Sequence, residues 1–155
     1  MPDSQMAGRI VGHELRVARL ETLEGGGGGG GGGTHVLWCP LFWGGAVLPA
    51  RIWFDFRWLG ISGTVVSWSI YGQIVVGTIT VDILKSTHAA WTRDNTGFAS
   101  ICGGNQPALV AADKDYDNTL AGWSTAVAAS DIWRIYTAGV ATALTRVDLH
   151  IRVDE

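Results

Sequence analysis

The amino-acid sequence predicts an all-β protein, a jelly-roll-like antiparallel β-sandwich preceded by a short N-terminal helix and a polyglycine spacer. Three observations predict this class. Residues 34–155 contain apolar runs with the two-residue alternation of half-buried strands. Residues 25–33 are nine consecutive glycines, and residues 1–24 space their apolar side chains as a helix does. We therefore divide the chain into a helix (1–24), a linker (25–33) and a sandwich domain (34–155).

The N-terminal segment has the apolar spacing of an amphipathic helix. Its apolar stripe recurs at alternating intervals of four and three residues, which is an a/d seam, and consists of Met6, Ile10, His13, Val17 and Leu20. A helix of about two heptads is too short to be stable alone. We therefore expect the stripe to associate with copies of itself or to dock on another protein. The alternative is a frayed tail whose spacing arises by chance.

The glycine run is interpreted as a flexible spacer. Glycine has no side chain to pack and loses the most backbone entropy on ordering. A phosphate-binding loop is excluded, because no predicted strand precedes the run and no Lys-Ser/Thr pair follows it. In a narrower alternative, glycine runs from several chains pack side by side as polyglycine II helices.

The first strands of the sandwich domain are predicted from aromatic and β-branched runs. Residues 51–58 are rich in Trp and Phe, which suit a pleated surface. Residues 63–70 and 74–84 follow as two longer runs. The short link at residues 71–73 contains a glycine, so we expect these two runs to form a β-hairpin.

The C-terminal strands are the clearest in the sequence. Residues 131–136 form one apolar run, and residues 146–153 alternate strictly between polar and apolar side chains. This alternation predicts a strand with one face in the core and the other in water. The apolar face consists of Val147, Leu149, Ile151 and Val153.

The stretch between these strand groups, residues 85–130, consists of turn signals separated by short apolar pieces. Long irregular connections are where ligand contacts usually lie. Trp91 stands there next to Arg93 and Asp94, and an indole can stack on a sugar ring. These three residues are the candidate ligand contacts. The alternative for Trp91 is a cover over the open end of the core, or a subunit contact.

Metal and catalytic motifs are weak or missing. Asp113, Asp115 and Asp117 alternate as at the start of a calcium loop, but Asn118 and Ser124 stand where an EF-hand needs glycine and glutamate. We interpret the three carboxylates as parts of a solvated turn.

The four histidines are isolated, and neither cysteine lies in a nucleophile motif. A glycosidase pair of Asp82 with Asp94 or Asp117 is conceivable but ranks last. We therefore expect a protein that is not an enzyme and that holds no metal and no cofactor.

Composition indicates the kind of partner. The chain is 47% hydrophobic and only 16% charged, with eight tryptophans, so part of its apolar surface is expected to face other subunits. The net charge of -3 and the scattered basic residues argue against nucleic acid. No apolar stretch is long enough for a bilayer, and no signal peptide is evident, which favours assembly in a cytoplasm. Cys39 and Cys102 are expected to be free thiols.

From residue 64 onward the chain resembles a β-sandwich domain near the C-termini of tailed-bacteriophage tail, tail-fibre and other virion appendage proteins. The similarity includes an apolar strand that closes on Asp82-x-x-Lys85. Family members often have a proline pair in the following loop, where this chain has residues 91–94, and a glycine at the position of Ser130. The matching blocks are residues 63–68 with 74–85, 106–109 with 117–123, and 129–132 with 142–153.

The resemblance implies a location in the virion and a structural, non-enzymatic role, with no catalytic or binding residues to carry over. We expect an appendage subunit, with homotrimer as the first choice, that contacts other virion proteins through its N-terminal segment. Its displayed sandwich is expected to contact host surface glycans, because several weak heads on one appendage give strong attachment. The alternatives are a capsid decoration or head-fibre protein and, from another class, a free carbohydrate-binding module.

Overall fold

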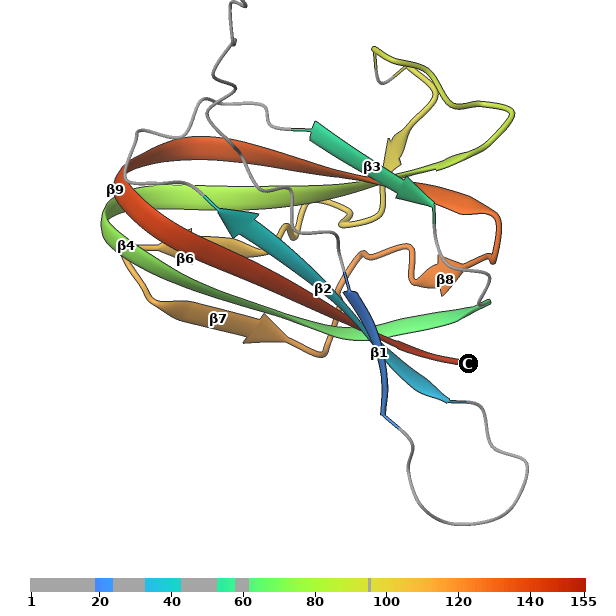
Figure 1. The fold of residues 1–155 in the computed structure, drawn as a ribbon, viewed down its shortest axis with the longest axis horizontal. Helices are drawn as coiled ribbons and strands as arrows, with labels where there is room; N and C mark the ends of the chain where they lie inside the picture. Colours follow the sequence, from blue (N-terminus) through green and yellow to red (C-terminus); the bar gives the residue numbers. More distant parts are fainter. Residues whose placement is uncertain (1–18, 24–32, 43–52, 58–61, 95) are drawn as a thin grey trace, which may run out of the picture.

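The computed structural model describes residues 19–23, 33–42, 53–57, 62–94 and 96–155. All regular elements in this part of the chain are β-strands, and every strand pairing is antiparallel, as the sequence predicts (Figure 1). No helix within these residues is long and apolar enough to cross a membrane.

Two very long strands form the frame of the molecule. Strand β4 (Gly63–Thr87) has 25 residues and β9 (Asp131–Asp154) has 24. They pair from Thr64↔Asp154 to Thr87↔Asp131, so the two strands run side by side over almost their whole length. Both turn back at the same end of the molecule, on the left in Figure 1. The paired strands therefore form one ribbon that folds over into two layers.

The first arm of β4 (residues 63–73) pairs with the second arm of β9 (residues 146–154), and we call this layer the β2 layer. On the β9 side it adds β2 (Thr34–Phe42), and β1 (Arg19–Leu23) pairs with β2. On the β4 side lie β7 (Lys114–Asp117) and β8 (Ala126–Val127).

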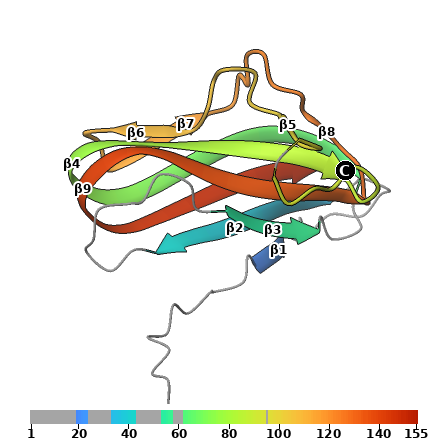
Figure 2. The ribbon, with the colours of Figure 1, turned by 90° about the horizontal axis from the view of Figure 1, so that it is seen from above.

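The other two arms, residues 77–87 of β4 and 131–141 of β9, form the β3 layer. Strand β3 (Trp53–Arg57) pairs with β9, and β5 (Ala99–Ser100) and β6 (Ala108–Val110) pair with β4. Figure 2 shows β1 to β3 on one side of the ribbon and β5 to β8 on the other. The result is a β-sandwich of two antiparallel layers.

The fold-over of the ribbon has a local cause. The register between the long strands shifts between Gln73 and Ile74, because Gln73 pairs with Arg146 and Ile74 with Leu144. Such a bulge bends a strand and increases its twist. Gly77, just after the bulge, has a φ of 119°, a backbone conformation that residues with a Cβ rarely adopt. The bend therefore depends on this bulge and on glycine.

The core lies between the two layers. Val147, Leu149, Ile151 and Val153 are all 0% exposed, so the alternation predicted for the last strand is confirmed. The facing layer contributes buried side chains from β4, β6 and β9, which are Ile79, Val81, Ile83, Leu109, Trp133 and Ile135.

The predicted hairpin at residues 71–73 is wrong. The backbone continues through Tyr71, Gly72 and Gln73 as part of β4, and all three residues pair with β9. The glycine and its polar neighbour mark the approach to the bend between the layers rather than a reversal of the chain. The runs 131–136 and 146–153, predicted as separate strands, are likewise two arms of β9.

The expected N-terminal helix does not extend to residue 24. Residues 19–23 form β1, an edge strand whose register with β2 runs from Arg19↔Trp38 to Leu23↔Thr34. The sheet therefore begins before residue 34, where the sequence placed the start of the sandwich domain. Residues 1–18 and the glycines at 25–32 lie outside the described residues.

The connection between β4 and β9, residues 88–130, contains β5 to β8 and packs closely on the sandwich. Ile101, Cys102, Leu120 and Trp123 from this connection are buried. The indole Nε1 of Trp123 donates a hydrogen bond to the backbone oxygen of Asn105 at 2.9 Å. The stretch is largely irregular, as expected, but these side chains contribute to the core.

Candidate functional site

The outer face of the β2 layer carries a row of side chains from four neighbouring strands. The backbone register aligns Trp38 on β2 with His150 on β9, His150 with Ser69 on β4, and Ser69 with Tyr116 on β7. Directly paired residues point to the same side of a sheet. Tyr71 stands two residues beyond Ser69, so its side chain points to this same side.

The rings of this row form a partly exposed aromatic surface. The Trp38 and His150 rings meet edge to face with centroids 6.3 Å apart, and the Tyr71 and His150 rings are 5.5 Å apart. Tyr71 is 45% exposed and Tyr116 is 58% exposed. We call the surface formed by Trp38, Tyr71, Tyr116, Arg146, Asp148 and His150 the Tyr71 face.

Asp148 organises the charged part of the Tyr71 face. Its Oδ1 accepts a hydrogen bond from Nε1 of Trp38 at 3.2 Å, and its Oδ2 pairs with Nε of Arg146 at 2.6 Å. The residue is only 7% exposed. The Arg146 charge balances the nearly buried carboxylate, and each oxygen fixes the direction of one neighbouring side chain.

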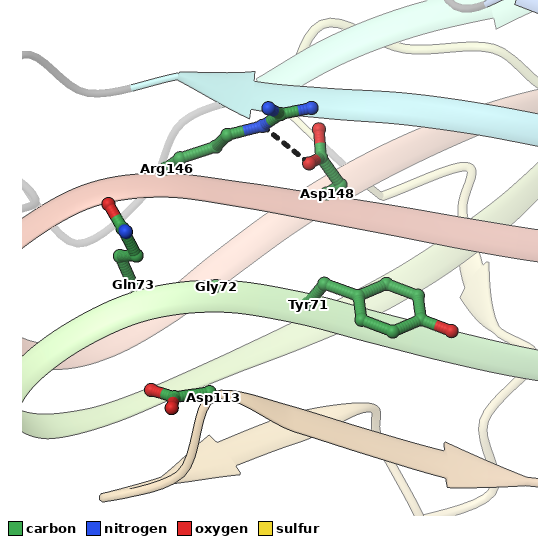
Figure 3. Close-up of a pocket in the computed structure, with 6 residues that line it drawn as sticks. All are labelled: Tyr71, Gly72, Gln73, Asp113, Arg146 and Asp148. Carbon is green, nitrogen blue, oxygen red and sulfur yellow. Dashed lines mark ion pairs between the residues drawn. The ribbon is translucent and has the colours of Figure 1, made fainter.

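A cavity of about 370 Å³ opens on this face (Figure 3). Its walls come from the first arm of β4, from the second arm of β9 and from the segment before β7. The backbone oxygen of Asp113 accepts a hydrogen bond from the Gly72 amide at 2.8 Å, which holds that segment against β4. The lining residues are Tyr71, Gly72, Gln73, Asp113, Arg146 and Asp148.

Trp91, the first predicted ligand contact, lies away from this cavity. Its Nε1 donates a hydrogen bond to Oδ2 of Asp55 on β3 at 2.8 Å, and the residue is 43% exposed. Nη2 of Arg134 binds the same carboxylate oxygen at 2.6 Å and the backbone oxygen of Thr92 at 3.1 Å. The polar edge of the indole is therefore engaged, and the loop is tied to β3 and β9.

The Asp55 carboxylate interacts closely with the Arg134 guanidinium. Burial acts to raise the pKa of Asp55, but the hydrogen bonds from Arg134 and Trp91 and the Arg134 charge outweigh it and hold the pKa below its ordinary value. The Arg134 guanidinium also lies 4.0 Å from the centre of the Phe98 ring, a cation–π contact. This cluster has the features of a structural ion pair.

Arg93 and Asp94, the other two predicted contacts, are exposed on the same loop as Trp91. Oδ1 of Asp94 accepts hydrogen bonds from the Thr96 amide at 3.3 Å and from the Thr96 hydroxyl at 2.9 Å. These bonds hold the pKa of Asp94 below its usual range. The three predicted residues lie on the same loop, but the Asp94 carboxylate is already hydrogen-bonded within its own turn.

The predicted oligomerisation residues fall mostly outside the described part of the chain. Met6, Ile10 and Val17 lie outside the described residues. Leu20 belongs to β1, where its backbone pairs with Leu37. Leu20 is therefore part of a strand and not of a helical stripe.

The described residues contain no group of three or more metal-ligating side chains. Of the three alternating aspartates, Asp115 accepts a hydrogen bond from the Tyr116 amide and Asp117 accepts two from Thr119. Asp113 is the member that lines the cavity.

The two cysteines are free and buried, as the sequence predicts. Burial raises the pKa of both thiols, to about 12 for Cys102, so neither is a thiolate near neutral pH.

The residues of the Tyr71 face were not selected from the sequence. The alternation at residues 146–153 did place Arg146, Asp148 and His150 on a solvent-facing side. Tyr71 was assigned to a turn, and nothing in the sequence aligned Trp38 or Tyr116 with these residues. The sequence signal that could have pointed to the Tyr71 face is an aromatic residue near a strand whose polar side chains alternate with apolar ones.

No protein-family model and no curated protein matches the chain. The functional argument therefore depends on the geometry above and on the sequence resemblance.

Proposed function

We propose that the chain is a structural subunit of a tailed-bacteriophage virion, in a fibre or tail appendage, and that its sandwich is displayed for contact with the host surface. The protein is not an enzyme in this proposal. The observation that carries it is the position of the blocks that resemble virion appendage domains. Residues 63–68 and 74–85 lie in β4, and residues 129–132 and 142–153 lie almost wholly in β9, the strand that pairs with it.

These blocks are far apart in the sequence, yet they form the frame of one unit. An antiparallel ribbon that folds over into two layers is also how a jelly roll is built, and we propose this finer class for the sandwich. In this proposal the compact head is preorganised for contact, which lowers the entropy lost on binding.

The N-terminal part of the chain supplies attachment in this proposal. Residues 1–18 dock on other virion proteins or associate as a homotrimer through Met6, Ile10 and Val17, and β1, which follows directly, joins this anchor to the head, while the glycine run lies between β1 and β2 in the sequence. A capsid decoration or head-fibre protein would use the same parts on a different surface. The Tyr71 face favours a second candidate as well, a free carbohydrate-binding module.

The location of the protein tests the proposal. Antibodies raised against the full chain should label purified particles from induced cells that carry the gene, at a regular position on the tail. Particles from cells in which the gene is deleted are the control and should remain unlabelled. Label on the capsid would favour the decoration alternative. Protein found only outside the particles would contradict a virion role and favour the free module.

A further inference from the structure

We propose that the Tyr71 face is a carbohydrate-binding surface for a chain of neutral hexopyranose units. The inference deepens the proposed host-surface role, on which it rests, by assigning the site and the class of ligand. It places the contact on the outer face of the β2 layer instead of the loop that carries Trp91.

The two exposed tyrosines are the first part of the argument. Sugar rings have apolar C–H faces that pack on aromatic rings, and tyrosine offers such a ring at low entropy cost. Ser69 pairs with Tyr116, so Tyr71 and Tyr116 are diagonal neighbours on adjacent strands. Diagonal neighbours lie about 7–8 Å apart, so one extended ligand can contact both rings.

The polar groups that line the cavity indicate the charge of the ligand. Arg146 is already paired with Asp148, so this cation is balanced within the protein. Asp113 is exposed and, among the described residues, its carboxylate has no hydrogen-bond or ion-pair partner, so it adds an acceptor to the cavity. A carboxylate acceptor repels anions and binds hydroxyl groups, which favours a neutral sugar over a phosphorylated or acidic one.

The cavity and its walls complete the case. Ligand pockets have volumes of about 300–1,000 Å³, and the cavity of about 370 Å³ lies at the low end, suitable for a short part of a chain. Five of its six lining residues belong to β4 and β9, and the backbone of Asp113 is bonded to Gly72. The backbone of the site is therefore held by the strands themselves, which favours a preorganised surface. Figure 3 shows the side chains around the cavity.

Saturation-transfer NMR on the full-length protein tests this assignment, with maltohexaose, cellohexaose and the neutral hexa-N-acetylchitohexaose as the probes. We expect saturation transfer to at least one of them with a Kd of about 1 mM, the range of weak single sites. Tyr71→Ala and Tyr116→Ala should each raise that Kd about tenfold or more, while Tyr71→Phe, which keeps the ring, should bind nearly as the unchanged protein does.

Two matched controls remove exposed apolar side chains elsewhere. Trp91→Ala changes the loop on β3, and Val110→Ala changes a residue 66% exposed on β6 in the other layer. Both should keep the affinity. Melting curves of every variant show whether it is folded, and Tyr116→Ala decides the question should Tyr71→Ala unfold.

Three results would overturn the inference: no saturation transfer to any of the three probes, unchanged binding by the Tyr71→Ala/Tyr116→Ala double variant, or loss of binding only in Trp91→Ala. If the antibodies label the particles but the protein binds none of the sugars, the virion role is supported and this site is rejected. Sugar binding by a protein that is absent from particles would support this site and contradict the virion role.

Discussion

Arg134 is the side chain on which the Trp91 loop depends. It is only 3% exposed, and its guanidinium binds the Asp55 carboxylate, the backbone of Thr92 and the Phe98 ring. A buried guanidinium that loses its carboxylate keeps the cost of desolvation without compensation. One residue therefore connects β3, β9 and the loop, and it explains why Trp91 is better described as part of a support than as a free platform.

Removing the partner of this cation should destabilise the fold. Asp55→Asn is expected to lower the free energy of unfolding by about 2–3 kcal/mol at about pH 7, because it leaves buried charged donors poorly satisfied. Chemical denaturation of the two proteins measures the difference. Asp113→Asn, which changes an exposed carboxylate, is the control and should have little effect.

The pH dependence of that difference provides the check on mechanism. Because the pKa of Asp55 is lower in the folded protein than in the unfolded chain, its stabilising effect is complete above about pH 5. The effect is lost as the pH falls through the folded pKa. The wild-type advantage over Asp55→Asn should therefore shrink between about pH 5 and about pH 2. A constant difference over this range would contradict the ion-pair explanation.

The bend of β4 is the element that decides whether the ribbon becomes a sandwich. If β4 and β9 continued straight after residue 73, their arms would form one flat sheet with both faces exposed. The register shift after Gln73 and the positive φ of Gly77 allow the arms to face each other. The burial of Ile79 and Ile151 on opposite layers depends on this geometry.

A side chain at Gly77 should strain this bend. Gly77→Ala is expected to lower the free energy of unfolding by about 1–3 kcal/mol, the usual cost of a residue with a Cβ held at positive φ. Thr80→Ala, in the same arm, is the control and should cost about 0.5 kcal/mol. Urea denaturation compares the two. Equal effects would mean that the backbone at Gly77 relaxes without strain.

The long strands also show what the sequence could and could not predict. The two-residue alternation at residues 146–153 depends only on neighbours, so the inward and outward sides of this arm were predicted correctly. The continuity of β4 was missed because a glycine between two apolar runs is compatible with a tight turn and with a bulged strand.

The Tyr71 face was out of reach for a related reason. Trp38 and His150 are paired across more than a hundred residues of sequence, and Tyr116 joins them through a second long-range ladder. Such registers are set by the packing of whole layers and by the turns between strands. Single aromatic residues in the sequence do not indicate which of them will become neighbours.

Across the molecule as a whole, β1 links the N-terminal part of the chain to the sandwich. It pairs with β2 at the edge of the β2 layer, next to the strand that holds Trp38. An unpaired edge strand is a site for association with other chains. The N-terminal segment can therefore affect two separate properties, the oligomeric state through Met6, Ile10 and Val17, and the protection of the β2 edge through residues 19–23.

Two truncated proteins should separate these properties. A protein that begins at residue 19 lacks the apolar stripe but keeps β1, and one that begins at residue 34 lacks both. We expect the full chain to be an oligomer in light scattering and the first truncation to be a monomer with nearly the same melting temperature. The second should still melt cooperatively, because β4 and β9 supply most of the core, but at a lower temperature and with concentration-dependent association through the open β2 edge.

The comparison between the two truncations carries the conclusion. A full chain that is already monomeric at micromolar concentration, or a first truncation that keeps the oligomeric mass, would show that residues 1–18 do not mediate assembly. A second truncation as stable and as monomeric as the first would show that β1 contributes neither stability nor edge protection. Loss of cooperative melting only in the second would show that the domain begins at β1 instead of at β2, because the β2 layer then requires its edge strand to fold.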